Sequence, residues 1–311
     1  MNILKLALLV VFTEAAHAAT VGHDMFSHRI TKGQLREPLL NDISGMAASR
    51  VFPGIVYVHN YQGDGNYIYA VDVENAKLVA TFVIQGAQNF DWEDIAYGPC
   101  RDDCKQTPCS ASAVPSRFCL YISDTGSHGG AGAADVIYMV REPTALNDSA
   151  LPVVDRLIFS WSEPDAESLF VTPDARLFIM SKVYTGRAMI AELPDSGWGS
   201  TVTLDLANTG IMKVTTTHND PQGADLSPDG KELLIVAEEE VFYYSVPDGD
   251  FINAVRTTVP ESIYSYTREP NTEGIAWTPD GKGFHVIARG DNPYVYYYAK
   301  DVASSGPGIG R

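Results

Sequence analysis

Acidic residues recur at fixed positions of a motif that the chain repeats five times. The most acidic copy is D-W-E-D-I-A-Y-G, residues 91–98. The copies begin D-I-S-G-M-A at Asp42, D-W-E-D-I-A at Asp91, D-A-E-S-L-F at Asp165, D-P-Q-G-A-D at Asp220 and N-T-E-G-I-A at Asn271. Glu93, Glu167 and Glu273 share the third position. Carboxylates that converge repel one another, so they need a cation, shared protons or basic partners.

Calcium is the cation that such a set of hard oxygen donors suits best. The predicted ligands combine two motif glutamates with polar residues that follow later strands: Glu93, Asp124, Glu238, Glu273 and Asn60. His128 and His59 are the candidates for a general base, because imidazole titrates near neutral pH. Glu93 could serve as ligand or base. No serine-nucleophile motif of the form G-x-S-x-G is present.

The leading residues of the motif have a second interpretation. Asp or Asn before a strand often bonds its own backbone and caps a turn. We favour that interpretation for the leading ring: Asp42, Asp91, Asp165, Asp220 and Asn271. Glutamate has little turn propensity, and its small neighbours Ser168 and Gly274 leave room for close packing. The glutamate set therefore carries the stronger indication of a site.

The spacing of the motif predicts a repeat architecture. Its third positions, at Ser44, Glu93, Glu167, Gln222 and Glu273, are 49, 74, 55 and 51 residues apart. A period of about 50 residues, with about four short strands in each repeat, is typical of a β-propeller. We predict an all-β fold with five blades. Six blades are the alternative, if residues 211–218 form an extra strand.

Short apolar alternations separated by turn residues predict the strands. The predicted strands are 56–58, 67–73, 78–84, 119–123, 136–140, 157–161, 177–180, 188–193, 202–206, 233–237, 241–246, 255–259, 284–288 and 294–299. No segment has a clear helical period. The last repeat has only three strands, so we expect residues 21–40 to supply the fourth and cover the open edge.

Residues after the second strand of each repeat should share one end of the channel with the motif. Those residues are His59, Asn60, Asp124, Lys182, Glu238, Glu239 and Arg289. We therefore expect a carboxylate-lined funnel with Lys182 and Arg289 at its rim.

The N-terminus reads as a secretory signal peptide over residues 1–18. Lys5 precedes an apolar run over 6–12, and Ala16-His17-Ala18 forms an A-x-A cleavage site. The run is far shorter than the roughly 20 residues of a membrane span. We expect a secreted protein with one β-propeller domain over 19–311. The sequon Asn147-Asp148-Ser149 would be a glycosylation site in a eukaryotic host.

Four cysteines lie close together in the long second repeat: Cys100, Cys104, Cys109 and Cys119. In an exported protein this density favours two disulfides that staple a loop over 99–119. Three pairings are possible. A zinc site is the alternative, but the C-x3-C-x4-C-x9-C spacing matches no usual zinc pattern.

The formal net charge is −17 at pH 7. That charge argues against nucleic acid or an anionic membrane surface as a partner. We expect a monomer that binds a small-molecule or glycan ligand in its central funnel.

Three stretches together resemble a largely uncharacterised family of secreted β-propeller proteins. They are D-W-E-D-I-A-Y-G-P, L-Y-I-S-D-T-G and V-I-Y-M-V-R-E-P, within residues 44–143. The family's motifs are similar: D-W-E-D-I-A, then Y-L-Y-x-x-D-x-G-D-N, then I-Y-x-x-x-E-P. This chain departs at Asp124-Thr125-Gly126-Ser127-His128, where the family's second Asp and its Asn are absent.

A more distant similarity is to calcium-dependent propeller lactonases of the gluconolactonase and paraoxonase type. It rests on E-G-I-A at Glu273 and on the carboxylate-lined channel. The resemblance implies a calcium ion that polarises an ester carbonyl and activates water, held by Glu93, Asp124, Glu273 and Asn60. Those lactonases have six blades, whereas we expect five here.

The sequence is consistent with three functions. The first is a calcium-dependent hydrolase of a small ester, lactone or phosphoester. The second is a non-catalytic propeller that binds a glycan, peptide or cation. The third is a glycoside hydrolase with paired carboxylates, such as Asp42 or Glu93 with Glu167, roughly 5–10 Å apart.

Overall fold

The computed structural model describes residues 25–101, 118–127, 134–215, 220–237, 239–263 and 265–300. Strands account for 52% of the described residues and helices for 6%, so the predicted all-β class is confirmed. The proposed signal peptide, Cys104, Cys109, His128 and Glu238 lie outside the described residues. No described helix has the length and apolar character needed to cross a membrane.

The N-terminal half forms two four-stranded antiparallel groups. The first contains β2 (Ile43–Ala48), β3 (Ile55–Asn60), β4 (Tyr67–Asp72) and β5 (Lys77–Gln85). The second contains β6 (Trp92–Pro99), β7 (Phe118–Asp124), β8 (Asp135–Arg141) and β9 (Ser149–Ser160). Parallel pairing of β5 with the start of β9 joins the two groups at their outer edges.

Three further groups follow the same order. The third contains β10 (Ala166–Val171), β11 (Leu177–Ser181), β12 (Met189–Leu193) and β14 (Thr209–Ile211). The fourth contains β15 (Gly223–Leu226), β16 (Glu232–Val236), β17 (Val241–Ser245) and β18 (Glu261–Ser262). The fifth contains β19 (Thr272–Trp277), β20 (Gly283–Ala288), β21 (Tyr294–Ala299) and β1 (Ile30–Gln34).

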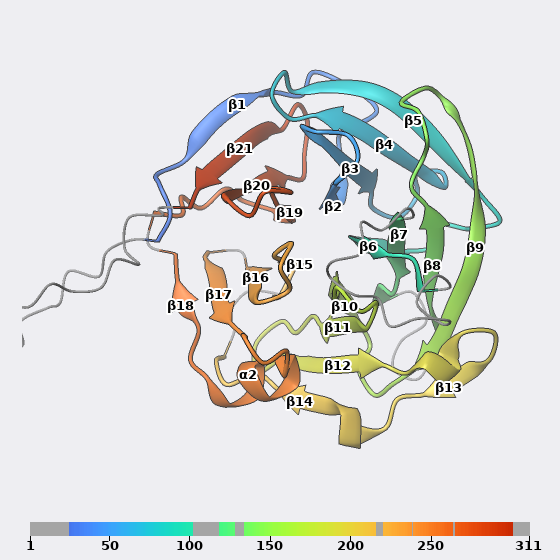
Figure 1. The fold of residues 1–311 in the computed structure, drawn as a ribbon, viewed down its shortest axis with the longest axis vertical. Helices are drawn as coiled ribbons and strands as arrows, with labels where there is room; N and C mark the ends of the chain where they lie inside the picture. Colours follow the sequence, from blue (N-terminus) through green and yellow to red (C-terminus); the bar gives the residue numbers. More distant parts are fainter. Residues whose placement is uncertain are drawn as a thin grey trace, which may run out of the picture.

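The first strands of the five groups face one another around the centre of the molecule (Figure 1). β2 contacts β6 and β19, β10 contacts β6 and β15, and β15 contacts β19. Nearly every residue of these strands is buried, because a neighbouring group covers each face. Each strand also begins within or directly after a copy of the acidic motif. The copies therefore meet at one end of a central ring.

The N-terminal strand completes the last group, as predicted. β1 pairs antiparallel with β21, with Ile30 opposite Tyr297 and Gln34 opposite Tyr294. An isolated bridge between Phe26 and Lys300 extends this contact. The edge of β21 is thereby covered by a strand from the other end of the chain.

Aromatic and aliphatic side chains fill the spaces between neighbouring groups. Tyr57, Phe82 and Trp92 belong to a cluster between the first and second groups. Between the third and fourth groups, Phe170 stacks on Phe178 with ring centroids 4.9 Å apart, and Phe251 packs edge-on against both. The core is thus divided into layers, each shared by two adjacent groups.

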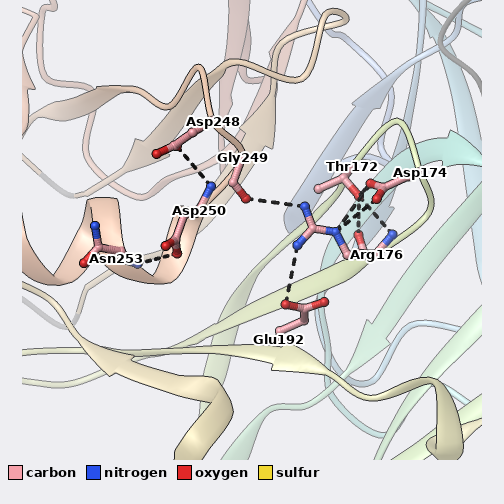
Figure 2. A network of polar contacts seen from close by, with 8 residues as sticks. All are labelled: Thr172, Asp174, Arg176, Glu192, Asp248, Gly249, Asp250 and Asn253. Carbon is pink, nitrogen blue, oxygen red and sulfur yellow. Dashed lines mark hydrogen bonds and ion pairs between the residues drawn. The ribbon is translucent and has the colours of Figure 1, made fainter.

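The repeated T-P-D and S-P-D-G-K tails of the motif form hairpin turns. In the first of them, Thr172 Oγ1 donates to Asp174 Oδ1 at 2.5 Å and accepts the Arg176 N–H at 2.9 Å. Ser227 with Asp229, and Thr278 with Asp280, repeat the hydroxyl–carboxylate bond. Figure 2 shows Arg176 reaching onward to Glu192 and to the Gly249 carbonyl. These tails are therefore accounted for by turn chemistry.

One strand prediction is wrong and a second is right only in part. Residues 255–259 fall partly in helix α2 (Phe251–Thr257), whose first turn is capped when Asp250 accepts the Asn253 N–H. Phe251 and Val255 are both buried, and their spacing of four places them on one helical face. Residues 202–206 lie across β13 (Thr201–Thr203) and a 3-10 turn (Leu206–Asn208), and β13 pairs with β9.

The cysteine-containing loop begins and ends at a disulfide between Cys100 and Cys119. This bond ties the end of β6 to the start of β7. It confirms one of the two disulfides expected. Cys104 and Cys109 lie outside the described residues.

Candidate functional site

Register shifts place the third residue of the motif at the centre of the ring. Trp92 lies opposite Asp124 and Asp94 lies opposite Ser123, so Glu93 is left without a partner on β7. Ser44, Glu167 and Glu273 are skipped in the same way. Such a bulge turns a side chain away from the alternation of the strand. A bulge that recurs in four of the five groups thus aims one side chain from each of them at the same end of the ring, whereas β15 and β16 pair without one.

Small residues beside these bulges let the strands approach one another closely. A Cβ atom at Gly45 would lie 2.8 Å from the Asp94 Cα atom of the neighbouring strand. One at Gly274 would lie 3.1 Å from the Met46 Cβ atom. A larger side chain at either position would force the central strands apart.

Three carboxyl groups converge at this end of the ring. One oxygen each from Glu93, Asp165 and Glu167 lie within 4.8 Å of one another. Glu93 and Glu167 are only 2% and 3% exposed, and Asp165 is half-buried. We name Glu93, Asp165 and Glu167 the carboxylate cluster. Its members come from β6, from β10 and from the residue directly before β10.

Two basic side chains balance part of this negative charge. Lys182, directly after β11, forms an ion pair with Glu167. Arg289, directly after β20, pairs with Asp42 and lies 3.5 Å from Glu273 Oε1. Lys182 and Arg289 thus both pair with carboxylates of the motif, whereas their place at the rim of a funnel stays a prediction. Asp42 uses its side chain in this ion pair, which the turn-capping interpretation did not anticipate.

Burial and mutual repulsion raise the pKa values of the central glutamates. Burial raises the pKa of Glu93 well above its usual range, and the carboxyls of Glu167, Asp91 and Asp165 add to the shift. Burial raises the pKa of Glu167 to about 8 despite the Lys182 ammonium, and Glu273 contributes further. The pKa of Glu273 rises to about 7, again through burial and against the Arg289 guanidinium.

Several buried oxygens at this end of the ring lack hydrogen-bond donors. Among the described residues, Glu167 Oε2, Glu273 Oε2 and Gln222 Oε1 have no hydrogen-bond partner. Buried polar atoms are rarely left in this condition. A water molecule, a bound cation or a proton on the carboxyl group would each resolve it.

The donor set of the carboxylate cluster fits a hard divalent cation. All three groups offer oxygen, the donor that calcium and magnesium prefer. Glu167 could offer Oε2 while its other oxygen, Oε1, remains bound to Lys182. The Lys182 ammonium already supplies one positive charge at this position, so a cation would share the carboxylates with it.

Two of the expected ligands have other partners. Asp124 Oδ1 accepts the Asp91 N–H at 2.8 Å, and its Oδ2 lies 3.4 Å from the Tyr138 hydroxyl. The Asn60 amide donates to the Leu39 carbonyl at 2.6 Å and to Asp64 at 2.9 Å. Both side chains thus brace the nearby backbone, while Asn60 Oδ1, the atom that could bind a cation, is buried without a hydrogen-bond partner among the described residues. Of the five expected ligands, only Glu93 is a member of the carboxylate cluster.

The other two expected ligands differ in position. Glu273 lies beside the cluster, since its carboxyl group acts electrostatically on Glu167 and is itself influenced by Lys182. Glu238 lies outside the described residues, as does the candidate base His128.

His59, the second candidate base, is completely buried. Its ring packs edge-on against Trp92, with centroids 5.6 Å apart, and its Nδ1 atom lies 3.1 Å from the Asn60 carbonyl. Burial lowers its pKa to about 4, so the ring is neutral at pH 7. This position between the first and second groups gives the imidazole a packing role.

Gly126 closes one side of the cluster. A Cβ atom there would overlap the Glu93 and Asp91 carboxyl groups, so the carboxylates pack directly on the glycine backbone. The Gly126 and Thr125 N–H groups also donate to the Asp91 carbonyl, at 3.2 Å each. The D-T-G segment therefore holds two acidic residues in place.

Asp165 and Asp94 have roles that the sequence did not reveal. The sequence favours a turn cap for Asp165, and only its spatial proximity to Glu93 places it in the cluster. Asp94 Oδ2 accepts the N–H groups of Leu169 at 2.8 Å and Ala224 at 3.2 Å. Its carboxyl group thus links β6 to β10 and β15. The sequence does single out Asp94 as the only acidic residue at its motif position, without indicating its partners.

No protein-family model matches the chain, and no curated protein matches it significantly.

Proposed function

We propose that the fold is a five-bladed β-propeller in a secreted protein. Five four-stranded groups in chain order, a ring of first strands and the pairing of β1 with β21 support the blade count. The segment over 1–18 supports secretion. Asn147 in the sequon is exposed, as a glycosylated asparagine must be.

We propose that this propeller binds a divalent cation, calcium first, and uses it to hydrolyse a small ester, lactone or phosphoester. The convergence of Glu93, Asp165 and Glu167 within 4.8 Å carries the proposal. Glu93 and Glu167 are buried and Asp165 is half-buried, and carboxyl groups so close are stabilised either by a cation in addition to Lys182 or by bound protons. Bound calcium would polarise the scissile carbonyl or phosphoryl group and activate a water molecule.

Each residue near the cation would have a separate role in binding or catalysis. Glu93, Asp165 and Glu167 would hold the cation. Lys182 would orient Glu167 through their ion pair. Gly126 would keep Glu93 in place by direct packing. His128 follows Gly126 by two residues in the sequence and remains our proposed general base.

A non-catalytic cation or ligand site is the second candidate. The deep burial of Glu93 and Glu167 favours it, because a substrate must reach the reacting atoms. A glycoside hydrolase is less well supported. Glycosidases hold their two carboxyl groups roughly 5–5.5 Å apart when retaining and roughly 6.5–9.5 Å apart when inverting, beside a cleft that admits a sugar, whereas Glu93 and Glu167 are buried.

Calorimetric titration of the chelator-treated protein with calcium and magnesium tests the proposal. We expect one saturable site for calcium. Glu167→Gln should weaken binding by about tenfold or more, because it removes a charged ligand. Glu261→Gln, at an exposed position of β18, is the matched control.

The outcomes distinguish the candidates. No cation binding would refute the hydrolase proposal. Cation binding without ester, lactone or phosphoester turnover would favour the non-catalytic alternative. Turnover that the chelator abolishes and calcium restores would support hydrolysis.

A further inference from the structure

A cavity of about 380 Å³ lies at the end of the third group opposite the carboxylate cluster. β10 begins beside the cluster at Ala166 and ends at Val171, and the turn after it supplies Asp174, Ala175 and Arg176 to the wall. The end of β12 and the residues that follow it supply another part of the wall. A cavity of this volume suits a small organic molecule.

The two guanidinium groups in the wall are both paired with carboxylates. Arg101 pairs with Asp195 at 3.0 Å. Arg176 pairs with Asp174 at 3.2 Å and with Glu192 at 3.5 Å (Figure 2). All five residues line the cavity. Because each guanidinium group already has a counter-ion, the cavity needs no charged ligand to balance it.

Hydrogen-bonding capacity remains in the wall after these ion pairs have formed. Asp195 pairs through Oδ1 and Glu192 through Oε2, so the second oxygen of each carboxylate has no partner among the described residues. Asn208 is exposed, and its side chain forms no hydrogen bond with the described part of the chain. Its amide offers both donors and an acceptor. A hydroxyl-bearing ligand could therefore donate to the carboxylates and bond the amide in either direction.

One aromatic side chain lines the cavity together with these polar groups. Trp198 is half-buried, with the Arg101 guanidinium 5.3 Å from its ring centroid and the Tyr121 ring edge-on at 6.3 Å. An indole supplies apolar surface for the C–H groups of a ligand. Paired charges, spare hydrogen-bonding atoms and an indole together suit a neutral ring compound rich in hydroxyl groups.

We propose that this cavity binds a neutral monosaccharide unit. Its hydroxyl groups would bond Asp195, Glu192 and Asn208, and its C–H groups would contact Trp198. A neutral sugar fits better than a sugar acid, because three carboxylates and only two guanidinium groups line the cavity and a further negative charge would be repelled. The cavity lies away from the central ring, so the inference does not depend on the proposed hydrolase function.

Ligand-observed NMR titration of the full chain with the methyl β-glycosides of glucose, galactose and N-acetylglucosamine tests the inference. We expect at least one of them to bind saturably. Methoxycyclohexane, a ring of similar size without the hydroxyl groups, should bind at least about tenfold more weakly. Asp195→Ala should weaken glycoside binding about threefold to tenfold. Asp291→Ala removes the same charge at an exposed position outside the cavity and should leave binding unchanged.

A second variant tests the cavity without removing a charge. Asn208→Trp places a large ring in the cavity from an exposed position, where substitution is tolerated, and should also weaken glycoside binding. The proposal would be overturned if none of the three glycosides bound saturably, or if methoxycyclohexane bound equally well. Equal effects of Asp195→Ala and Asp291→Ala would overturn it too, because they would place the sugar elsewhere.

Discussion

At the scale of single residues, the candidate site depends on one acidic position and one glycine. Glu93 leaves the strand alternation through a bulge, and its carboxyl group then packs against Gly126. Both Glu93 and Gly126 are buried. A change in the position of either residue would therefore displace the other. The smallest change at Gly126 should therefore affect the whole carboxylate cluster.

We predict that Gly126→Ala destabilises the fold by about 1–3 kcal/mol, the usual cost of overpacking. The new methyl group would overlap the Glu93 and Asp91 carboxyl groups. Calcium affinity should fall with it, because Glu93 must move. Ser127→Ala, at the exposed neighbouring position, should change neither quantity. Denaturant unfolding and calcium titration measure both effects, and a neutral Gly126→Ala would contradict the assigned packing.

At the scale of elements, Glu142 joins the first and second groups of strands. Its carboxylate accepts hydroxyl hydrogen bonds from Ser49 at 2.5 Å, Tyr57 at 3.1 Å and Tyr97 at 2.5 Å. Ser49 and Tyr57 belong to the first group, and Tyr97 to the second. The E-P of the stretch V-I-Y-M-V-R-E-P thus has a structural explanation, because Glu142 is its acidic residue.

Removing this carboxylate should cost stability. Glu142→Ala leaves three largely buried hydroxyl groups without their acceptor, so we expect a loss of about 2–4 kcal/mol in the free energy of unfolding. Glu142→Gln keeps one oxygen acceptor and should lose less. Glu261→Ala serves as the exposed control. A loss below about 0.5 kcal/mol for Glu142→Ala would show that the groups hold together without it.

The repeated groups of strands could be predicted from the sequence, whereas local features such as bulges could not. Alternating apolar residues located most strands, and the incomplete last repeat correctly required a strand from the N-terminus. The bulge at Glu93 was not predictable, because register depends on the partner strand. Helix α2 was missed because its seven residues hold only two buried apolar positions. The place of Asp165 in the carboxylate cluster was not predictable either. It depends on contact with Glu93 from another group of strands, and such a contact produces no pattern in the neighbouring sequence.

At the scale of the whole molecule, several acidic side chains meet where the groups of strands come together. The net charge is −17, and the central ring gathers Asp42, Asp91 and the carboxylate cluster around two basic residues. Folding therefore brings together carboxyl groups that are far apart in the unfolded chain. Protons and divalent cations compete to relieve that repulsion, and this competition makes stability depend on pH.

The raised pKa values of Glu167, about 8, and Glu273, about 7, fix the sign of that dependence. Between the unfolded values near 4.5 and these folded values, the folded state binds more protons. Stability without divalent cations should therefore fall as pH rises from about 5 to about 8. Calcium needs the ionised carboxylates, so its stabilising effect should grow over the same range. Thermal melts with chelator and with calcium, compared between wild type and Glu167→Gln, measure both trends. Glu167→Gln removes one titrating group and should flatten them, whereas equal slopes in the two proteins would exclude Glu167 as their source.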